Sequence, residues 1–178
     1  ATFTRWCFSP GFAALCLERF GFSQAELNLQ FEMWLQYVRT HIPPVFPGMG
    51  DIIRRQKAEG GLICVVSHSS QENILRDYRT HFDLEPDCIF GWELGNERRK
   101  PNPYPLDEIM KRYGLAASDM LMVDDLKPGY DMAKARHVDF AWAGWGRSNV
   151  PEITAFMNAN CKLLFDTVGA LEKYLFEA

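Results

Sequence analysis

The sequence predicts an α/β fold: a parallel sheet with helices on both faces, preceded by a small N-terminal helical cap. Two observations lead to this prediction. From residue 61 onward, short apolar runs alternate with segments of helical periodicity, which is the pattern of strand–helix–strand units. Before residue 41 the apolar spacing is helical and no strand-like run interrupts it. We therefore expect a cap over residues 1–43 and an α/β core over residues 44–178.

The N-terminal segment is expected to form two helices. The first covers residues 10–20, with a proline in its first turn and Gly21 just past its end. Ser23 is a suitable N-cap for the second. We interpret Met33 and Trp34 on this second helix as core packing rather than as ligand contacts. Its apolar face is expected to hold Leu27, Phe31, Trp34, Leu35 and Val38.

The prolines between residues 43 and 47 end the helical pattern and mark the junction with the core. Beyond it, β-branched and apolar runs predict strands, and amphipathic stretches predict helices. The expected strands are 62–67, 88–92, 118–123, 139–145 and 161–165. The expected helices are 49–59, 71–81, 105–113, 128–136 and 168–176. We expect Trp142 and Trp145 to be core or cap-contact aromatic residues.

Composition excludes several kinds of partner. With 178 residues, 47% of them apolar, the chain can fill a sizeable core. A formal net charge of −4 gives no electrostatic case for nucleic acid or an anionic membrane. No apolar run approaches the ~20 residues of a bilayer span. The five scattered cysteines, without CxxC spacing, predict reduced thiols in a cytoplasmic protein. Composition does not predict the oligomeric state.

An acidic pair ends the most informative strand. The run from Met120 to Val123 is apolar, and Asp124 and Asp125 follow it directly. A buried parallel strand delivers such side chains to a cleft at its C-terminal edge. Two adjacent carboxylates repel each other, and a hard cation such as Mg²⁺ is the usual reason to place them together. An ordinary surface turn, in which aspartate is common, is the alternative.

A second strand ends in hydroxyl side chains. Ser67 follows the run 62–66 and precedes His68, Ser69 and Ser70. A hydroxyl beside backbone N–H groups at a strand-to-helix turn suits a phosphate oxygen, although an N-cap role for Ser67 is the alternative. The glycines of a G-x-S-x-G elbow are absent, which argues against an acyl-transfer nucleophile. We expect His68 and Ser69 to bind substrate, although a histidine here can equally be packed or solvent-facing.

The third feature is the basic stretch 98–103, Arg-Arg-Lys-Pro-Asn-Pro. Because Lys100 precedes a proline, its backbone is held extended and its ammonium can be aimed at an anion. The alternative is a solvated basic loop.

In the order hydroxyl, lysine, acidic pair, these features resemble the haloacid dehalogenase (HAD) superfamily, particularly its phosphoglycolate phosphatase-like and β-phosphoglucomutase-like members. The similarity runs over about residues 44–145. It implies a Rossmann-like core in which Ser67 holds the transferring phosphoryl group and Lys100 neutralises charge on nucleophile and phosphate. It also implies that Asp124 and Asp125 hold Mg²⁺.

One motif of the family is missing from the sequence. The family's Asp-x-Asp-x-Thr, which supplies the nucleophile and the general acid/base, should precede the cap, and nothing of that form precedes Ser9. Asp51 does not follow a strand and cannot replace it. In the family this strand lies between the Ser67 strand and the Asp125 strand, so its omission leaves two unpaired edges. We therefore expect the chain to be a fragment whose first strand lies upstream.

The resemblance implies that the intact protein is a Mg²⁺-dependent phosphatase for small phosphorylated metabolites, acting through an aspartyl-phosphate. A phosphomutase is a variant of this class. The chain as given is then expected to be inactive or nearly so. The alternative is a non-enzymatic HAD-like module that binds phosphate or a partner. The sequence does not indicate which phosphate ester is bound.

Overall fold

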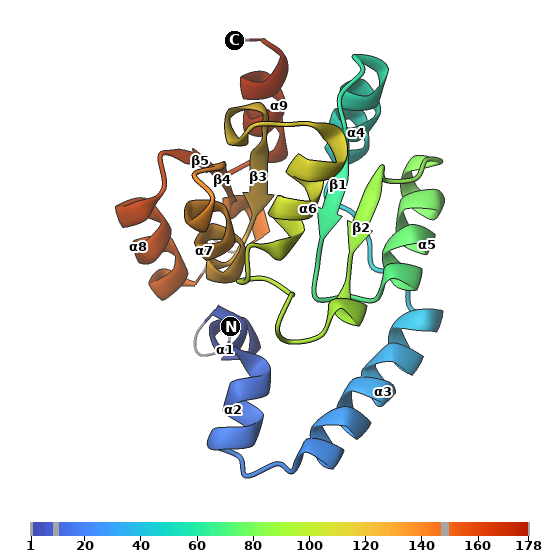
Figure 1. Cartoon of the computed structure of the whole chain (residues 1–178), viewed down its shortest axis with the longest axis vertical. Coiled ribbons are helices and arrows are strands. Elements are labelled where there is room, and N and C mark those ends of the chain that lie inside the picture. The colour runs from blue at the N-terminus through green and yellow to red at the C-terminus, as the bar shows by residue number, and fades with distance from the viewer. Residues whose placement is uncertain (1, 9–10, 147–149, 178) are drawn as a thin grey trace.

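The computed structural model describes residues 2–8, 11–146 and 150–177 (Figure 1). Helices make up most of it, namely α1 (Thr2–Phe8), α2 (Phe12–Glu18), α3 (Gln24–Thr40), α4 (Met49–Ala58), α5 (Gln71–Phe82), α6 (Tyr104–Tyr113), α7 (Lys127–Ala135), α8 (Pro151–Asn160) and α9 (Val168–Phe176). The strands are short, namely β1 (Cys64–Val66), β2 (Cys88–Phe90), β3 (Leu121–Asp124), β4 (Asp139–Ala143) and β5 (Leu163–Phe165).

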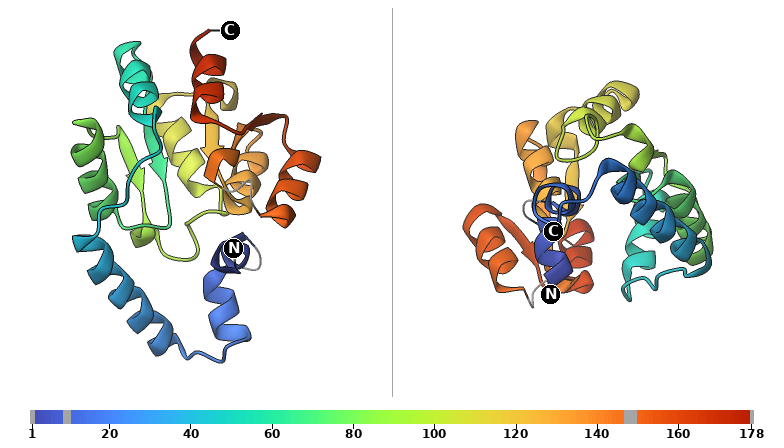
Figure 2. Two further views of the ribbon diagram at one scale, coloured as in Figure 1. Left: turned by 180° about the vertical axis from the view of Figure 1, so that it is seen from behind. Right: turned by 90° about the horizontal axis from the view of Figure 1, so that it is seen from below.

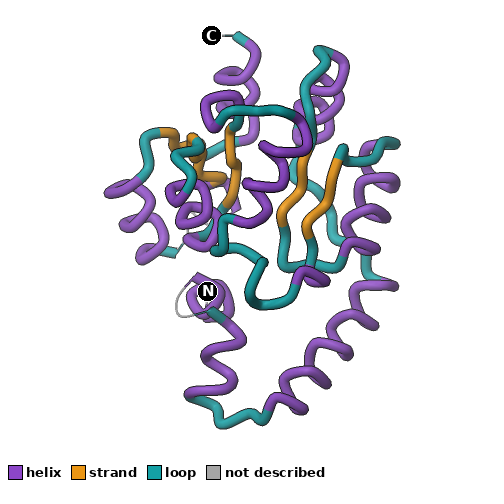
Figure 3. Tube along the Cα trace, viewed as in Figure 1, coloured by secondary structure: helices purple, strands orange, loops and turns teal. Residues whose placement is uncertain are grey.

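The strands form two parallel sheets instead of one continuous sheet. β1 pairs with β2, and the second sheet has the order β3–β4–β5. Figures 1 and 3 place β1 and β3 at the inner edges of the two sheets. Within the described ranges neither inner edge has a strand partner. Two unpaired edges at this place agree with the expectation that the strand placed by the resemblance between the Ser67 and Asp125 strands is not part of this sequence.

Helices cover both faces of the larger sheet, as expected. Along β4 the side chains alternate between two apolar clusters, as the pleat of a strand requires. Phe140 and Trp142 lie in a cluster with residues of α6, α7 and α8. Ala141 lies in the other cluster, with residues of α4 and α9. A mixed α/β fold with parallel sheets is therefore confirmed. The domain boundary at residue 43 stays a prediction.

Most core elements lie where the periodicity predicts them, but the strands are shorter and some helices are additional. The expected strand 88–92 ends at Phe90, and Trp92 begins a 3₁₀ turn, η1 (Trp92–Leu94). Helices α1 and α8 were not predicted. The first expected helix is α2, which begins at Phe12, while residues 9 and 10 lie outside the described ranges.

Helix α3 begins where the sequence predicts, because its N-cap is correct. The Ser23 hydroxyl accepts a hydrogen bond from the Glu26 N–H, and the Glu26 carboxylate accepts one from the Ser23 N–H. This capping box satisfies two backbone donors at the helix start. Figure 2 shows α3 running away from the sheets toward α2.

The apolar face of α3 is only partly covered, so the core-packing interpretation of two residues was wrong. Phe31 is half-buried, but Met33 is 63% exposed and Trp34 is 37% exposed. No described residue of α3 is fully buried. The reason is that α3 diverges from α2 beyond the loop that joins them and touches the core only locally, so one side of its apolar face remains in water (Figure 1).

None of the helices described is both long and apolar enough to cross a bilayer. The five cysteines are free thiols, as the sequence predicts.

Candidate functional site

Lysine and aspartate from distant parts of the sequence meet at the inner edge of the larger sheet. The Lys100 Nζ atom lies 2.5 Å from the Asp124 Oδ2 atom. Their side chains are 15% and 6% exposed, so this ion pair is largely shielded from water. Lys100 comes from the loop after β2, and Asp124 ends β3. The contact therefore joins the two separate sheets at the edge where the sequence predicts a site.

Asp124 is held by the start of α7 as well as by Lys100. The Leu126 N–H donates to the Asp124 Oδ1 atom at 3.0 Å. Gly129 in the first turn of α7 packs so closely that a Cβ there would lie 2.4 Å from Oδ2. This position therefore requires glycine, a requirement that the sequence pattern does not reveal. The carboxylate is fixed from two sides before any ligand arrives.

The same contacts determine the charge of Asp124. Burial alone would raise the pKa of this carboxyl, because a low-dielectric setting disfavours the charged form. The Lys100 ammonium and the hydrogen bonds from Lys100 Nζ and the Leu126 N–H outweigh burial, so the pKa of Asp124 is lowered. Asp124 is therefore ionised at neutral pH.

The residues after β1 approach the same place. The His68 Nε2 atom lies 2.9 Å from the Lys100 carbonyl oxygen, which ties the β1 turn to the lysine loop. The Ser67 hydroxyl accepts a hydrogen bond from the Ser69 N–H at 3.1 Å. Ser70, and not Ser67, is the N-cap of α5, because its hydroxyl accepts from the Asn73 N–H. The N-cap alternative for Ser67 is therefore wrong.

His68 lies beside two cations. Its side chain keeps contact with solvent, but partial loss of hydration lowers the pKa of His68, and the Lys100 and Arg99 charges act in the same direction. The hydrogen bond to Lys100 and the charge of Asp124 oppose this effect without reversing it. His68 is therefore mostly neutral near pH 7, with Nε2–H donating to the Lys100 carbonyl oxygen and Nδ1 left as an acceptor.

The basic stretch is not a uniformly solvated loop. Arg98 is exposed, but Arg99 is only 8% exposed. The Arg99 guanidinium lies 3.5 Å from the ring centroid of Trp92, whose ring also stacks on Phe31 of α3 at 3.9 Å. This stack connects the cap-like helix to the loop that carries Lys100. Arg99 and Trp92 were not among the predicted site residues. The only local signal for them was their place beside the lysine motif.

Asp124 and Asp125 fit Mg²⁺ in donor chemistry but do not form a complete ligand shell. Mg²⁺ commonly takes one or two carboxylates and completes its octahedron with water and substrate phosphate. The described residues contain no cluster of three or more His, Cys, Asp or Glu side chains suited to a metal. The Asp125 carbonyl oxygen accepts a hydrogen bond from the buried Trp142 Nε1 atom at 3.2 Å, which holds the end of β3.

The predicted site residues thus lie around one edge, with different degrees of contact. Lys100, Asp124 and His68 form a connected set. Ser67 and Ser69 reach this set through the neighbouring His68, and Asp125 through Asp124. The chemical roles assigned to these residues stay predictions.

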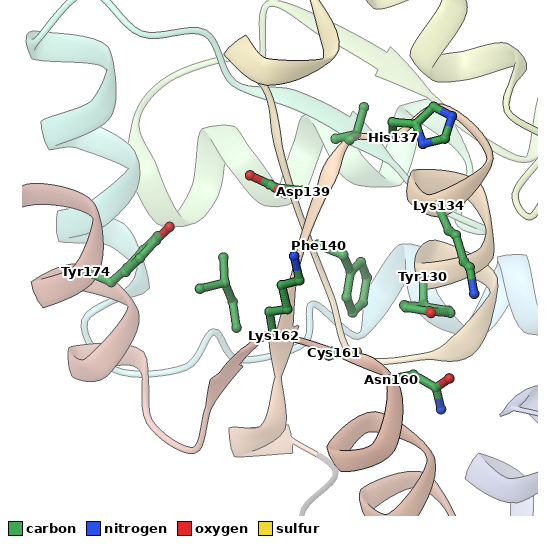
Figure 4. A pocket seen from close by; sticks show the side chains of 11 residues that line it. Tyr130, Lys134, His137, Asp139, Phe140, Asn160, Cys161, Lys162 and Tyr174 are labelled. Atoms are coloured by element: carbon green, nitrogen blue, oxygen red, sulfur yellow. The ribbon is translucent and has the colours of Figure 1, made fainter.

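A separate hollow lies at the opposite end of the larger sheet, where β4 and β5 begin (Figure 4). Its volume is about 480 Å³. Lys134, His137 and Lys162 line it together with Asp139 and the ring of Tyr174. It shares no lining residue with the Lys100–Asp124 edge.

Comparison with known protein families supports the resemblance noted in the sequence. A family model described as haloacid dehalogenase-like hydrolase matches residues 15–136, which is more than half of the chain. No curated protein matches the sequence.

Solved structures share the fold at low sequence identity. A candidate phosphoglycolate phosphatase from Lactobacillus delbrueckii subsp. bulgaricus is 24% identical with a TM-score of 0.70, and the alignment covers 86% of this chain and 64% of that one. A candidate haloacid dehalogenase-like hydrolase from Bacteroides fragilis is 21% identical with a TM-score of 0.74, covering 95% and 80%. CbbY from Rhodobacter sphaeroides, in complex with xylulose 1,5-bisphosphate, is 18% identical with a TM-score of 0.59, covering 76% and 60%. The chain thus spans less than two thirds of the Lactobacillus and Rhodobacter proteins.

Proposed function

The chain belongs to the haloacid dehalogenase-like hydrolases, and on this basis we propose that the intact protein is a Mg²⁺-dependent phosphatase for a small phosphorylated metabolite. The observation that carries the proposal is the shielded contact between Lys100, in the loop after β2, and Asp124, at the end of β3, which lie 24 residues apart in sequence. An ammonium beside a fixed carboxylate at a sheet edge suits a phosphoryl group together with its counter-cation. The CbbY complex with a sugar bisphosphate supports a phosphorylated ligand for this fold.

The chain's own residues would bind and orient the phosphoryl group. Ser67 would donate its hydroxyl to one phosphoryl oxygen, and Lys100 would neutralise charge on the oxygens as the transition state develops. His68, held by the Lys100 carbonyl, would contact the substrate beside them. Asp124 and Asp125 would hold Mg²⁺, which when bound supplies positive charge to the phosphoryl oxygens.

Covalent catalysis needs a carboxylate that these residues do not supply. The sequence contains no Asp-x-Asp-x-Thr, and the carboxylates of Asp124 and Asp125 are assigned to the cation. We propose that the nucleophile comes from a strand outside this sequence that pairs with the inner edges of β1 and β3. The exposure of these edges supports the idea, since Val123 on β3 is 37% exposed although it lies in an apolar run.

Phosphate binding tests the site directly. We expect inorganic phosphate to bind in the presence of Mg²⁺, measured by isothermal titration calorimetry, and Lys100→Gln to weaken binding at least tenfold. Lys57→Gln is the matched control, because that lysine pairs with Asp87, which lies just before β2 begins and therefore at the opposite end of the smaller sheet from the site. Equal loss in both variants, or no binding to the parent chain, would contradict the proposal.

A binding module without catalysis is the second candidate, and the absence of the nucleophile motif from the sequence is the observation that favours it. The coding sequence upstream of Ala1 separates the two candidates. An Asp-x-Asp-x-Thr after an apolar run there supports the enzyme, and an immediate start codon supports the module.

For a version that carries the upstream segment, p-nitrophenyl phosphate turnover should fall strongly in Asp125→Ala. Equal rates would remove the acidic pair from the mechanism.

A further inference from the structure

Two cysteines face each other across the smaller sheet. Cys64 on β1 and Cys88 on β2 are direct partners in the parallel register. Partners in adjacent strands point their side chains to the same face and lie ~4.8 Å apart. Both thiols pack against the main apolar cluster on the α6 side of the sheet. The pair is distinct from the proposed phosphate site, because Cys64 and Cys88 begin their strands and the phosphate site lies at the C-terminal ends of the strands.

The surroundings of the pair differ for the two sulfurs. Cys88 is 6% exposed and Cys64 is half-buried. The Cys64 thiol and the Tyr113 side chain lie close to the Cys88 sulfur, and the Tyr113 hydroxyl donates to the Asp87 carbonyl oxygen at 2.8 Å. The proximity of Cys64 and Tyr113, with the charge of Arg112, lowers the pKa of the Cys88 thiol, while desolvation and the nearby Asp87 oppose this effect. The pKa of Cys64 is raised, chiefly by its proximity to Cys88.

The spacing also permits a covalent bond between the sulfurs. A disulfide requires a Cα–Cα separation of roughly 4.4–6.8 Å, and in-register parallel neighbours fall within that range.

We propose that Cys64 and Cys88 are a peroxide-sensitive dithiol that oxidises to an intramolecular disulfide between β1 and β2. The Cys88 thiolate attacks one oxygen of a hydroperoxide, the O–O bond breaks, and the products are a sulfenic acid and hydroxide or alkoxide, which takes up a proton. The Cys64 sulfur then attacks the sulfenic sulfur. The S–O bond breaks, the S–S bond forms, and the proton of Cys64 leaves with the hydroxyl group as water. The hydroperoxide is reduced, and the two thiols are oxidised.

The remaining thiols provide internal controls. Cys16 is buried in α2, and the Cys161 thiol donates to the Met157 sulfur at 3.5 Å. Burial raises the pKa of both, so neither favours the thiolate that attacks peroxide. The proposed reaction therefore favours the Cys64–Cys88 pair over Cys16 and Cys161.

Peptide mapping tests the proposal. The chain is treated with hydrogen peroxide at low protein concentration, its free thiols are alkylated, and it is digested without reduction for mass spectrometry. We expect the Cys64 and Cys88 peptides to be joined, with loss of two hydrogen atoms, and dithiothreitol to release them. Cys161→Ser should leave this crosslink unchanged. In Cys64→Ser, Cys88 should instead be trapped as a sulfenic acid by dimedone. Recovery of both residues as alkylated thiols, or oxidation of other cysteines first, would overturn the proposal.

Discussion

The two halves of the candidate site are built differently. At the end of β3, Asp124 is fixed by an ion pair, a backbone hydrogen bond and a glycine packed against it. At the end of β1, Ser67 is half-buried, and the described bond to its hydroxyl comes from its own turn. β3 belongs to a three-stranded sheet, whereas β1 has β2 as its only strand partner in the described chain. The comparison suggests that the acidic half is preformed and that the hydroxyl half depends on further contacts.

The largest effect should come from removing the Lys100 ammonium, which pairs with Asp124 in the acidic half. Lys100→Met leaves the Asp124 carboxylate buried without its partner, and breaking such a pair costs about 3 kcal/mol of unfolding free energy. Lys127→Met removes a partly exposed pair with Asp131 and should cost about 0.5 kcal/mol or less. Urea unfolding of both variants measures the difference. Equal values would mean that Asp124 is not preformed by Lys100.

Steric crowding at the same residue should have the next largest effect. In Gly129→Ala the new Cβ would meet the Cβ, Cγ and Oδ2 atoms of Asp124, so we expect a loss of about 2 kcal/mol from overpacking. Gly169→Ala in α9 is the control, because a Cβ added there would meet no neighbouring atom within 4 Å. Alanine there should be neutral or stabilise by up to about 1 kcal/mol. Thermal unfolding of the two variants measures the change in stability for each. Equal destabilisation by Gly129→Ala and Gly169→Ala would refute the close packing of Gly129 against Asp124.

In the hydroxyl half, we expect Ser70 to serve stability and Ser67 to bind the ligand. Ser70→Ala removes the N-cap of α5 and should cost about 1 kcal/mol of stability with little change in phosphate affinity. Ser67→Ala should show the reverse, with weaker phosphate binding and a smaller stability loss. Chemical denaturation and calorimetry on both variants check this. A Ser67→Ala protein that binds phosphate normally would remove that hydroxyl from the site.

The smallest effect concerns protonation beside the site. The pKa of His68 is lower in the folded protein than in the unfolded chain. His68 in the folded protein therefore stays neutral until the pH falls to this lowered pKa. Its contribution to stability is therefore present above pH ~6.5 and is lost as the pH falls through the lowered pKa.

NMR titration of the His68 ring should show this low pKa, and Lys100→Met should raise it by removing a nearby cation. The variant His68→Gln assigns the resonance. A pKa that Lys100→Met leaves unchanged would place the ammonium away from the ring.

Local patterns predicted most core elements because their causes are local. Ser23 caps α3 through its own first turn, and the acidic pair follows a strand that its apolar run specifies. Helix α8 was missed although Ile153 and Met157 are fully buried, since two apolar positions one turn apart make only a weak periodic signal.

Other features depend on distant residues and could not be predicted from local patterns. The stack of Arg99 on Trp92 brings together a basic stretch and a residue assigned to a strand. Gly129 must be glycine only because the Asp124 side chain packs against the first turn of α7. The exposure of Trp34 follows from how little of the core α3 reaches. Local pattern predicts the elements, whereas tertiary packing decides which side chains are buried.

The central claim is that Ser67, Lys100 and the Asp124–Asp125 pair surround one phosphate-binding place. Backbone amide NMR of the chain titrated with inorganic phosphate and Mg²⁺ tests it most directly. We predict that amides in residues 67–71, 99–102 and 124–127 shift together with a single apparent dissociation constant. Shifts confined to one strand end, or centred on the hollow lined by Lys134, His137 and Lys162, would contradict it.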